Sequence, residues 1–378
     1  MNPVDRIAEK ARQYSDEIEK SRHLHPEVVR ILVDTGVLRS LVAQTYGGSE
    51  QPILEVLKVI EGVSQADGST GWCTMIASTT GLTSHSLRAD WAQTIYGDPA
   101  ACTGGFGMPI GTAQIVEDGL EVTGRWAWGS GTDHCSWIGG GVHVVDADGE
   151  RATTADGASA PFVFFDLDDV ELLDTWHVSG LKGTASTDYA VHRAFVPEGR
   201  WAQLIGGRPV VDSAASRFPF FGALAAGVAS VTLGLAERAV EELILLGEKK
   251  SAGSSKALAE RAPVQADLAR ATANIGQARS FLHEKVEEAW SMAVAGSPPT
   301  DECRAALRLA ATSAGWRAVE AVDLCYHAGG GSAVYETSPL QRVFRDAHVA
   351  CAHGMIASRT LEPLGRLGFG LPTSTVQF

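Results

Sequence analysis

The chain has 378 residues, of which 45% are hydrophobic and 20% charged, and its formal net charge is −14. This composition is typical of a globular protein with a large core, and it excludes a wholly disordered chain. The acidic balance argues against nucleic acid or an anionic membrane as the main partner, because both favour a basic surface. We therefore expect neither partner.

The cysteines and the N-terminus also exclude classes of protein. Six cysteines are widely spaced and form no CxxC pair: Cys73, Cys102, Cys135, Cys303, Cys325 and Cys351. This spacing fits neither a zinc ribbon nor a small secreted disulfide framework. HExxH and Glu-x-x-His motifs are absent, so no metal site is expected. The first residues, MNPVDRIAEK, are charged where a signal peptide is apolar, which predicts a cytoplasmic protein.

The first region, residues 1–98, is predicted to be helical. Its first helix is indicated by apolar residues at the three-and-four spacing of an amphipathic face, at Val4, Ile7, Ala11, Tyr14 and Ile18. A second helix begins at Pro26 and is closed by Gly36. Two further helices are predicted at 54–63 and 71–80.

The middle region, residues 99–212, is predicted to be a small antiparallel sheet or barrel. Glycine is dense here, and residues 120–123 and 142–144 alternate between apolar and other residues as strands do. More continuous apolar runs at 161–167 and 189–196 supply further strands. A parallel sheet is not expected, because no long helical pattern separates the strands.

The last region, residues 213–378, is predicted to be a four-helix bundle. The helices are expected at 223–246, 257–293, 301–328 and 340–357, with breaks at 251–255, 296–299 and 329–332. The uncharged stretch 218–236 is long enough to span a bilayer, but small residues dominate it and a charged helical sequence follows. It is therefore predicted to be a buried bundle helix. The fold class is α+β and mostly helical.

Aromatic and glycine residues are densest at 124–137, where three of the nine tryptophans lie. Trp128 and Ser130 are two residues apart and are expected on the same side of a strand, where they could offer an aromatic wall and a hydroxyl to a planar redox cofactor. The alternative is a tryptophan-lined strand and turn inside the core. Rossmann, P-loop and GxSxG motifs are absent.

Two glycine runs and two histidines complete the candidates. The run at 101–107 is either a loop or a ligand cradle, and Gly329–Gly331 either caps a helix or approaches a pyrophosphate. His348 and His353 are expected on the last long helix, five residues apart, and so point in different directions. A helical histidine of this kind either packs or transfers protons.

Several motifs occur in the order seen in the acyl-CoA dehydrogenase fold. They are Tyr46-Gly47-Gly48, ADGSTGW at 66–72, Gly124-Arg125-Trp126, Gly330-Gly331 followed by PLQR at 339–342, and FRDAH at 344–348. Within this fold the chain resembles the flavin-dependent monooxygenases that are the oxygenase components of two-component systems. The resemblance covers nearly the whole chain, to about Gly365.

Two adjacent residues separate the oxygenases from the dehydrogenases. Many acyl-CoA dehydrogenases carry their catalytic glutamate nine residues after the arginine of the final Arg-Asp motif, where this chain has Gly354. His353 matches the histidine that the oxygenases place beside the flavin. The other family position for the glutamate, near 216–218, has no carboxylate either.

The resemblance implies roles for the candidate residues. The catalytic residues are His353 and Ser130, with Ser130 near flavin N5 and the histidine suited by its ordinary pKa of roughly 6.5. The cofactor contacts are Trp128 beside the ring, Ser130, Thr103 and Gly104 along the pyrimidine edge, and Gly329, Gly330 and Gly331 near the phosphate. The substrate side is Trp72, Thr80 and His85; Thr80 stands where several phenol hydroxylases have a histidine, and His85 is the nearest one.

The implied reaction uses reduced FMN or FAD, supplied by a separate NAD(P)H:flavin reductase. With O2 it forms a C4a-hydroperoxide that hydroxylates an aromatic substrate, phenolic or polycyclic. The alternatives are an N- or S-oxygenating relative, an acyl-CoA dehydrogenase whose base is Glu336 or Asp346, and a flavin-binding paralogue without turnover. The resemblance also implies a homotetramer.

Overall fold

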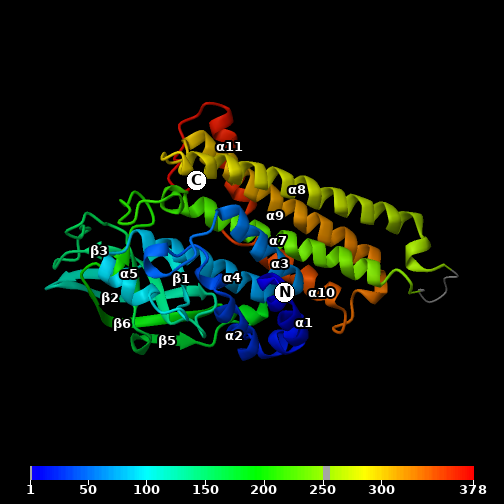
Figure 1. The fold of residues 1–378 in the computed structure, drawn as a ribbon, viewed down its shortest axis with the longest axis horizontal. Coiled ribbons are helices and arrows are strands. Elements are labelled where there is room, and N and C mark those ends of the chain that lie inside the picture. The colour runs from blue at the N-terminus through cyan, green and yellow to red at the C-terminus, as the bar shows by residue number, and fades with distance from the viewer. Residues whose placement is uncertain (1, 250–255) are drawn as a thin grey trace.

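The structure is a computed structural model that describes residues 2–249 and 256–378, so the break predicted at 251–255 lies outside the described residues. Helices from the N-terminal region pack beside a central sheet on one side and a bundle of long helices on the other (Figure 1). The predicted fold class, α+β and mostly helical, is confirmed.

The N-terminal helices are α1 (Pro3–Ser21), α2 (Pro26–Thr35), α3 (Ile53–Ala66), α4 (Gly68–Thr80) and α5 (Ala89–Tyr96). The first four agree with the predicted helices, and α5 was not predicted. His25 caps α2 by accepting the Glu27 N–H at 3.2 Å, and Gly36 ends it at φ 72°. The ADGSTGW motif forms the start of α4, where the Asp67 carboxylate accepts the Thr70 N–H at 2.8 Å.

The central sheet has seven strands in the order β5-β6-β2-β1-β3-β4-β7. They are β1 (Thr103–Val116), β2 (Gly119–Gly129), β3 (Trp137–Val145), β4 (Phe162–Phe165), β5 (Val170–Leu173), β6 (Thr187–Pro197) and β7 (Trp201–Ala202). The glycine run at 101–107 therefore enters the first strand and is not a loop.

The prediction of a purely antiparallel sheet was wrong, because β1 and β3 pair in parallel. No crossover helix is needed between them, since β2 runs back antiparallel to β1 and ends where β1 begins. The short segment 130–136 then passes the first residues of β1. It leads into β3, which lies on the edge of β1 opposite to β2. A parallel pair requires a long connection only when the two strands follow each other directly.

The bundle consists of α7 (Phe220–Leu245), α8 (Ala262–Val294), α9 (Asp301–Gly329) and α10 (Pro339–Cys351), with the short helices α6 (Ala214–Arg217) and α11 (Leu361–Gly368) at its ends. The last predicted helix was too long by several residues. Beyond Cys351 the chain turns. The Met355 N–H donates to the His353 side chain at 3.3 Å, instead of to a backbone carbonyl as it would in a continued helix. His353 therefore follows α10 and does not lie on it.

Helix α7 crosses the centre of the molecule between α3 and α9 (Figure 1). Among the described residues it is the one helix long and apolar enough to cross a membrane. However, 78% of its most apolar window is buried inside the molecule. This burial is the arrangement predicted for the uncharged stretch 218–236.

Candidate active site

Trp72 joins two segments that are far apart in the sequence. Its indole Nε1 donates a hydrogen bond of 2.9 Å to the Ser130 hydroxyl, in the loop after β2. Its ring meets the His353 imidazole edge to face, with centroids 5.5 Å apart. The three side chains come from α4, from the loop after β2 and from the turn after α10, so only the folded chain brings them together.

The Ser130 hydroxyl begins a chain of hydrogen bonds with a defined direction. Ser130 Oγ lies 2.7 Å from Ser186 Oγ, which lies 2.7 Å from Thr184 Oγ1. Thr184 donates its proton to the Leu181 carbonyl at 2.8 Å. Ser186 must therefore donate to Thr184, and Ser130 to Ser186. Since a hydroxyl has one proton and two lone pairs, Ser130 keeps one lone pair free after accepting from Trp72.

His353 is a neutral imidazole with an N–H to donate. Burial, together with the nearby charge of Arg308, lowers the pKa of His353 to about 4. The expectation of an ordinary pKa near neutrality was therefore wrong. Because Nδ1 accepts the Met355 N–H at 3.3 Å, the hydrogen-bond network assigns the ring proton to Nε2.

Arg308 places a buried positive charge next to this turn. The side chain is 3% exposed, and its Nε has no hydrogen-bond partner. One guanidinium nitrogen donates to the Gln377 carbonyl at 3.1 Å and contacts the Met355 sulfur at 3.4 Å. Within residues 2–249 and 256–378, no carboxylate pairs with it. Burial lowers the pKa of Arg308 to about 10, so it stays charged at neutral pH.

Trp128 and Ser130 do not lie on the same side of a strand, as the sequence predicted. Trp128 is 61% exposed, whereas Ser130 is buried. The pairing of β2 with β6 shifts register between Trp126 and Gly129, and Trp128 has a φ of 61°, which breaks the alternation. The exposed indole lies against Phe106, with ring centroids 5.5 Å apart.

The two residues predicted at the pyrimidine edge differ in placement. Gly104 lies against Ser130: a Cβ at this position would be 3.1 Å from the Ser130 carbonyl oxygen. The Thr103 side chain is buried, with its hydroxyl 3.3 Å from that of Tyr96. The structure therefore brings Gly104 to the Ser130 segment and turns Thr103 toward Tyr96.

The remaining predicted residues lie apart from Trp72, Ser130 and His353. Thr80 donates to the Ile76 carbonyl of its own helix at 2.8 Å. His85 is buried, with Nε2 3.2 Å from the Leu41 carbonyl oxygen and Nδ1 3.4 Å from the Ser213 hydroxyl. In the part of the chain that the structure describes, neither side chain contacts that group. His85 is a packed core residue.

Gly329–Gly331 ends α9 and forms the following turn, at the end of the bundle away from the sheet (Figure 1). Gly330 has a φ of 55°, which suits glycine after a helix. Gly330 and Gly331 are exposed. Within one chain, these glycines are therefore remote from Ser130.

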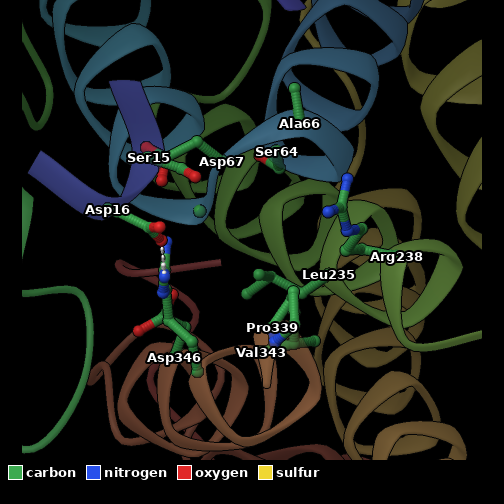
Figure 2. A pocket seen from close by; sticks show the side chains of 12 residues that line it. Ser15, Asp16, Ser64, Ala66, Asp67, Leu235, Arg238, Pro339, Val343 and Asp346 are labelled. Atoms are coloured by element: carbon green, nitrogen blue, oxygen red, sulfur yellow. Dashed lines mark hydrogen bonds and ion pairs between the residues drawn. The ribbon is translucent and has the colours of Figure 1, made fainter. Parts of the chain in front are cut away.

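The alternative bases of a dehydrogenase do not reach the group either. Asp346 lines a separate cavity of about 50 Å³ with Asp67 (Figure 2), and it accepts the Leu181 N–H at 2.6 Å. Burial raises the pKa of Asp346 to about 7. Glu336 is exposed on the surface. Among the described residues, no carboxylate hydrogen-bonds to Trp72, Ser130 or His353.

Sequence reasoning missed three residues of this site. Ser186 and Thr184 lie in a short Gly-Thr-Ala-Ser run that carries no recognisable motif. Arg308 had a signal, because among the described residues it is the one charged residue on the buried face of α9, beside small residues such as Ala311 and Gly315. A lone charge on such a face indicates a buried, functional or paired group.

Comparison with known proteins shows the family of the chain. The model for the acyl-CoA dehydrogenase N-terminal domain matches residues 3–89, and that for the C-terminal domain matches 226–358. An indole-3-acetate monooxygenase of Pseudomonas putida is 31% identical over 372 residues, covering 97% of this chain and 92% of its own length. The oxygenase subunit HsaA of a flavin-dependent monooxygenase of Rhodococcus jostii (strain RHA1) is 26% identical, with 98% of each chain covered.

A solved structure shares the fold. XiaF from Streptomyces sp., in complex with FADH2 and glycerol, matches with a TM-score of 0.90 at 24% identity, covering 98% of this chain and 94% of its own. The motif order, the glycine in place of a catalytic glutamate and the near full-length likeness agree with one another. The chain belongs to the flavin-dependent monooxygenases with the acyl-CoA dehydrogenase fold, whose members are oxygenase components.

Proposed function

We propose that Trp72, Ser130 and His353 form the active site of an oxygenase component that uses reduced FMN or FAD and O2 on an aromatic substrate. The observation that carries this proposal is the contact of one indole with both the Ser130 hydroxyl and the His353 ring. A reduced flavin supplies the two electrons with which O2 gives one oxygen atom to the substrate and the other to water.

The free lone pair of Ser130 fits a reduced flavin. N5 of a reduced flavin carries a hydrogen, whereas N5 of an oxidised flavin only accepts. Because the Ser130 proton is committed to Ser186, the serine would accept from N5–H of a reduced flavin and would not donate to bare N5. The exposed face of Trp128 offers a surface for the ring. These residues therefore favour the reduced over the oxidised cofactor.

His353 and Trp72 complete the polar side of the site. The Nε2 proton of His353 is available to an oxygen atom bound at the site, and the low pKa keeps that nitrogen neutral. A neutral donor stabilises developing negative charge by hydrogen bonding without giving up its proton at once. Trp72 fixes the orientation of both partners.

We also propose that the protein is a homo-oligomer, a tetramer as its resemblance to the family implies. We propose that it works in the cytoplasm with a separate NAD(P)H:flavin reductase. The support for shared sites is the length of α9: 21 residues separate Arg308, next to His353, from Gly329, which is roughly 30 Å of helix. This exceeds the reach of a flavin's ribityl phosphate chain. If the glycines contact the phosphate, they do so on a neighbouring copy.

The test compares flavin binding in two serine variants. Under anaerobic conditions the wild-type protein should bind reduced FMN or FAD more tightly than the oxidised form. Ser130→Ala should lower the affinity for reduced flavin by about 2–10-fold, the value of one hydrogen bond. Ser78→Ala is the matched control, since Ser78 is buried on α4 and donates to the Val37 carbonyl at 3.0 Å, outside the site.

The oxidation of the flavin provides a second measurement. When reduced flavin and protein are mixed with O2, the release of hydrogen peroxide should be slower than for free flavin, and Ser130→Ala should restore part of the free rate. Identical peroxide release with and without wild-type protein would overturn the proposed active site.

Arg308 supports a substrate that carries a negative charge. A buried guanidinium without a counter-charge is costly, and its Nε has no partner. A carboxylate or a similar anion on the aromatic substrate would supply both the counter-charge and a hydrogen-bond acceptor for the Arg308 Nε. The relative named for indole-3-acetate acts on a substrate of this chemistry. We propose an aryl carboxylate or another anionic aromatic compound, with the charge at Arg308.

This assignment is tested by pairs of charged and neutral substrates. Arg308→Gln should raise KM for an arylacetate by about 10–100-fold, as expected for a charged hydrogen bond, with little effect on the matching arylacetamide. Arg304→Gln is the control, on the same helix but paired with Asp301 at 2.6 Å. An equal loss for both substrates would show that Arg308 only holds the Gln377 segment.

A further inference from the structure

Two cysteines far apart in the sequence lie in contact next to the Ser130 segment of the active site. Cys102 lies just before β1 and Cys135 just before β3, and their sulfur atoms are 3.9 Å apart. Both side chains are buried. The Ser136 N–H donates to the Cys102 carbonyl at 2.8 Å, which fixes the two segments side by side. The parallel pairing of β1 with β3 therefore sets the distance between the two thiols.

A histidine and two further polar groups adjoin the pair. His134 lies next to Cys102, and its Nδ1 is 3.0 Å from one oxygen of Asp133. The other Asp133 oxygen is 2.7 Å from Nδ1 of His23. Gly131 leaves room for the His134 imidazole, because a Cβ at this position would be 3.0 Å from a carbon of that ring.

The electrostatics of the group favour a thiolate on one cysteine. A hydrogen bond from Cys135 lowers the pKa of Cys102 against the effect of burial, and the neighbouring His134 lowers it further. Burial opposes the charged form of His134, but Asp133 and Cys102 raise its pKa to about 10. The hydrogen bond to Cys102, together with burial, raises the pKa of Cys135. A thiolate with an adjacent imidazolium is the reactive form of cysteine.

We propose that Cys102 and Cys135 are a peroxide-reactive thiol pair that closes to a reversible disulfide. This inference goes beyond the proposed function and does not depend on it, since added hydrogen peroxide is the oxidant. An oxygenase that releases peroxide when it turns over without substrate would expose itself to the same oxidant. The remaining cysteines serve as internal standards.

The chemistry is balanced in two steps. The Cys102 sulfur attacks one peroxide oxygen, so that an S–O bond forms and the O–O bond breaks, and the leaving hydroxide takes a proton from His134 to give water. The Cys135 sulfur then attacks Cys102, so that the S–S bond forms and the S–O bond breaks. The second hydroxide leaves as water with the Cys135 proton. Two thiols lose two electrons, and one peroxide gains them.

Closure of the disulfide alters the Ser130 segment. A disulfide has an S–S length of about 2 Å, so the two sulfurs must move together by about 2 Å. The Cys135 sulfur is 3.0 Å from a Cβ built on Gly104, and that position is also 3.1 Å from the Ser130 carbonyl oxygen. The sulfurs, Gly104 and Ser130 are therefore in one packed layer. Oxidation should also lower the affinity for reduced flavin, and this one effect rests on the proposed contact of Ser130 with the cofactor.

The cysteine positions allow a direct test by mass spectrometry. The Lys and Arg residues place all six cysteines in different tryptic peptides, with Cys102 in 89–125 and Cys135 in 126–151. Flavin-free protein is treated with hydrogen peroxide, blocked with an alkylating reagent in denaturant and digested. The expected product is a cross-linked pair of these two peptides that disappears after reduction with dithiothreitol.

Three variants separate the roles of the residues. Cys135→Ser should leave Cys102 as a sulfenic acid that dimedone traps. His134→Gln should slow oxidation of Cys102 by about tenfold or more, because the neighbouring positive charge is lost. Cys325→Ser, in α9, should leave the cross-link unchanged, since burial raises the pKa of Cys325 to about 12. Circular dichroism checks that each variant is folded.

Several outcomes would overturn the proposal. They are oxidation of Cys102 no faster than of Cys325, a cross-link that joins Cys102 to Cys73, and disulfides only between chains. Cys73 is the relevant competitor, because its sulfur is also next to Gly131. A cross-link between peptides 89–125 and 126–151 that forms equally fast in His134→Gln would exclude the role given to the histidine.

Discussion

The imidazole of His353 shows how burial changes the chemistry of one residue. Sequence alone gives a histidine with an ordinary pKa near neutrality, which suits a base. In the folded protein burial and Arg308 lower the pKa of His353 to about 4, and Nδ1 is already occupied by the Met355 N–H. The residue is therefore a neutral donor through Nε2 across the physiological range.

A pH profile tests this state. The ratio of peroxide release rates for His353→Gln and wild-type protein should stay constant within about twofold from roughly pH 5.5 to 8, because His353 does not titrate there. Below about pH 5 the wild-type histidine gains a proton and the ratio should change. An inflection near pH 6.5 that is absent in His353→Gln would contradict the lowered pKa.

At the scale of elements, glycines decide how the sheet packs around Trp126. The indole is fully buried, stacks on Tyr189 with ring centroids 5.3 Å apart, and donates to the Gly141 carbonyl at 2.9 Å. A Cβ on Gly111, Gly124 or Gly140 would lie within 2.4–2.6 Å of indole atoms. Glycines on three adjacent strands thus form the slot that holds the ring. Two of these strands, β2 and β3, flank the Ser130 loop.

This slot predicts a stability difference between two glycine substitutions. Gly140→Ala should lower the free energy of unfolding by about 1–3 kcal/mol, because the new methyl group overpacks against Trp126. Gly276→Ala is the control: Gly276 is exposed in α8 with nothing within 4 Å of the added Cβ. It should stabilise the protein by about 0.5–1 kcal/mol through helix propensity. Urea unfolding measures both, and equal effects would contradict the packing argument.

At the scale of the whole molecule, Asp346 joins three parts of the chain. It belongs to α10, accepts the Leu181 N–H ahead of β6, and lies 3.2 Å from a Cβ built on Gly68 at the start of α4. Figure 2 shows it in the cavity with Asp67. Burial raises its pKa to about 7, with further repulsion from Glu19 and Asp67. The acid therefore folds most favourably when protonated.

The raised pKa predicts how stability depends on pH. Asp346 contributes stability that is fully present below its unfolded pKa of roughly 4 and is lost as pH rises through about 7. Between pH 4 and 8, the unfolding free energy of wild type relative to Asp346→Asn should fall by on the order of 2–4 kcal/mol. Asp34→Asn, at a surface pair with Arg30, should show little change. A pH-independent difference would contradict the raised pKa.

Much of the candidate site could be predicted from the sequence, but not its geometry. Ser130 and His353 were identified by their positions in motifs, and Trp72 as a residue of the substrate side. Their contact depends on β2 ending at Gly129 and on α10 ending at Cys351. Ser186 was not identified, because hydrogen bonds between distant segments leave no local pattern. Arg308 was missed although a lone charge on the buried face of a helix is a signal. His85 was predicted at the substrate but is a core residue. The sequence could not show this, because its partners Leu41 and Ser213 are remote in sequence.

The sequence by itself determined most of the helices, through their apolar spacing and caps, and the family, through motif order and the glycine at position 354. These features are local, and a chain carries them whether or not it is folded. Only the tertiary structure decided that β3 pairs in parallel with β1, that Cys102 meets Cys135 and that one indole joins Ser130 to His353. Each of these depends on which distant segments pack together, and packing also fixes the burial and the neighbouring groups that shift the pKa values discussed above.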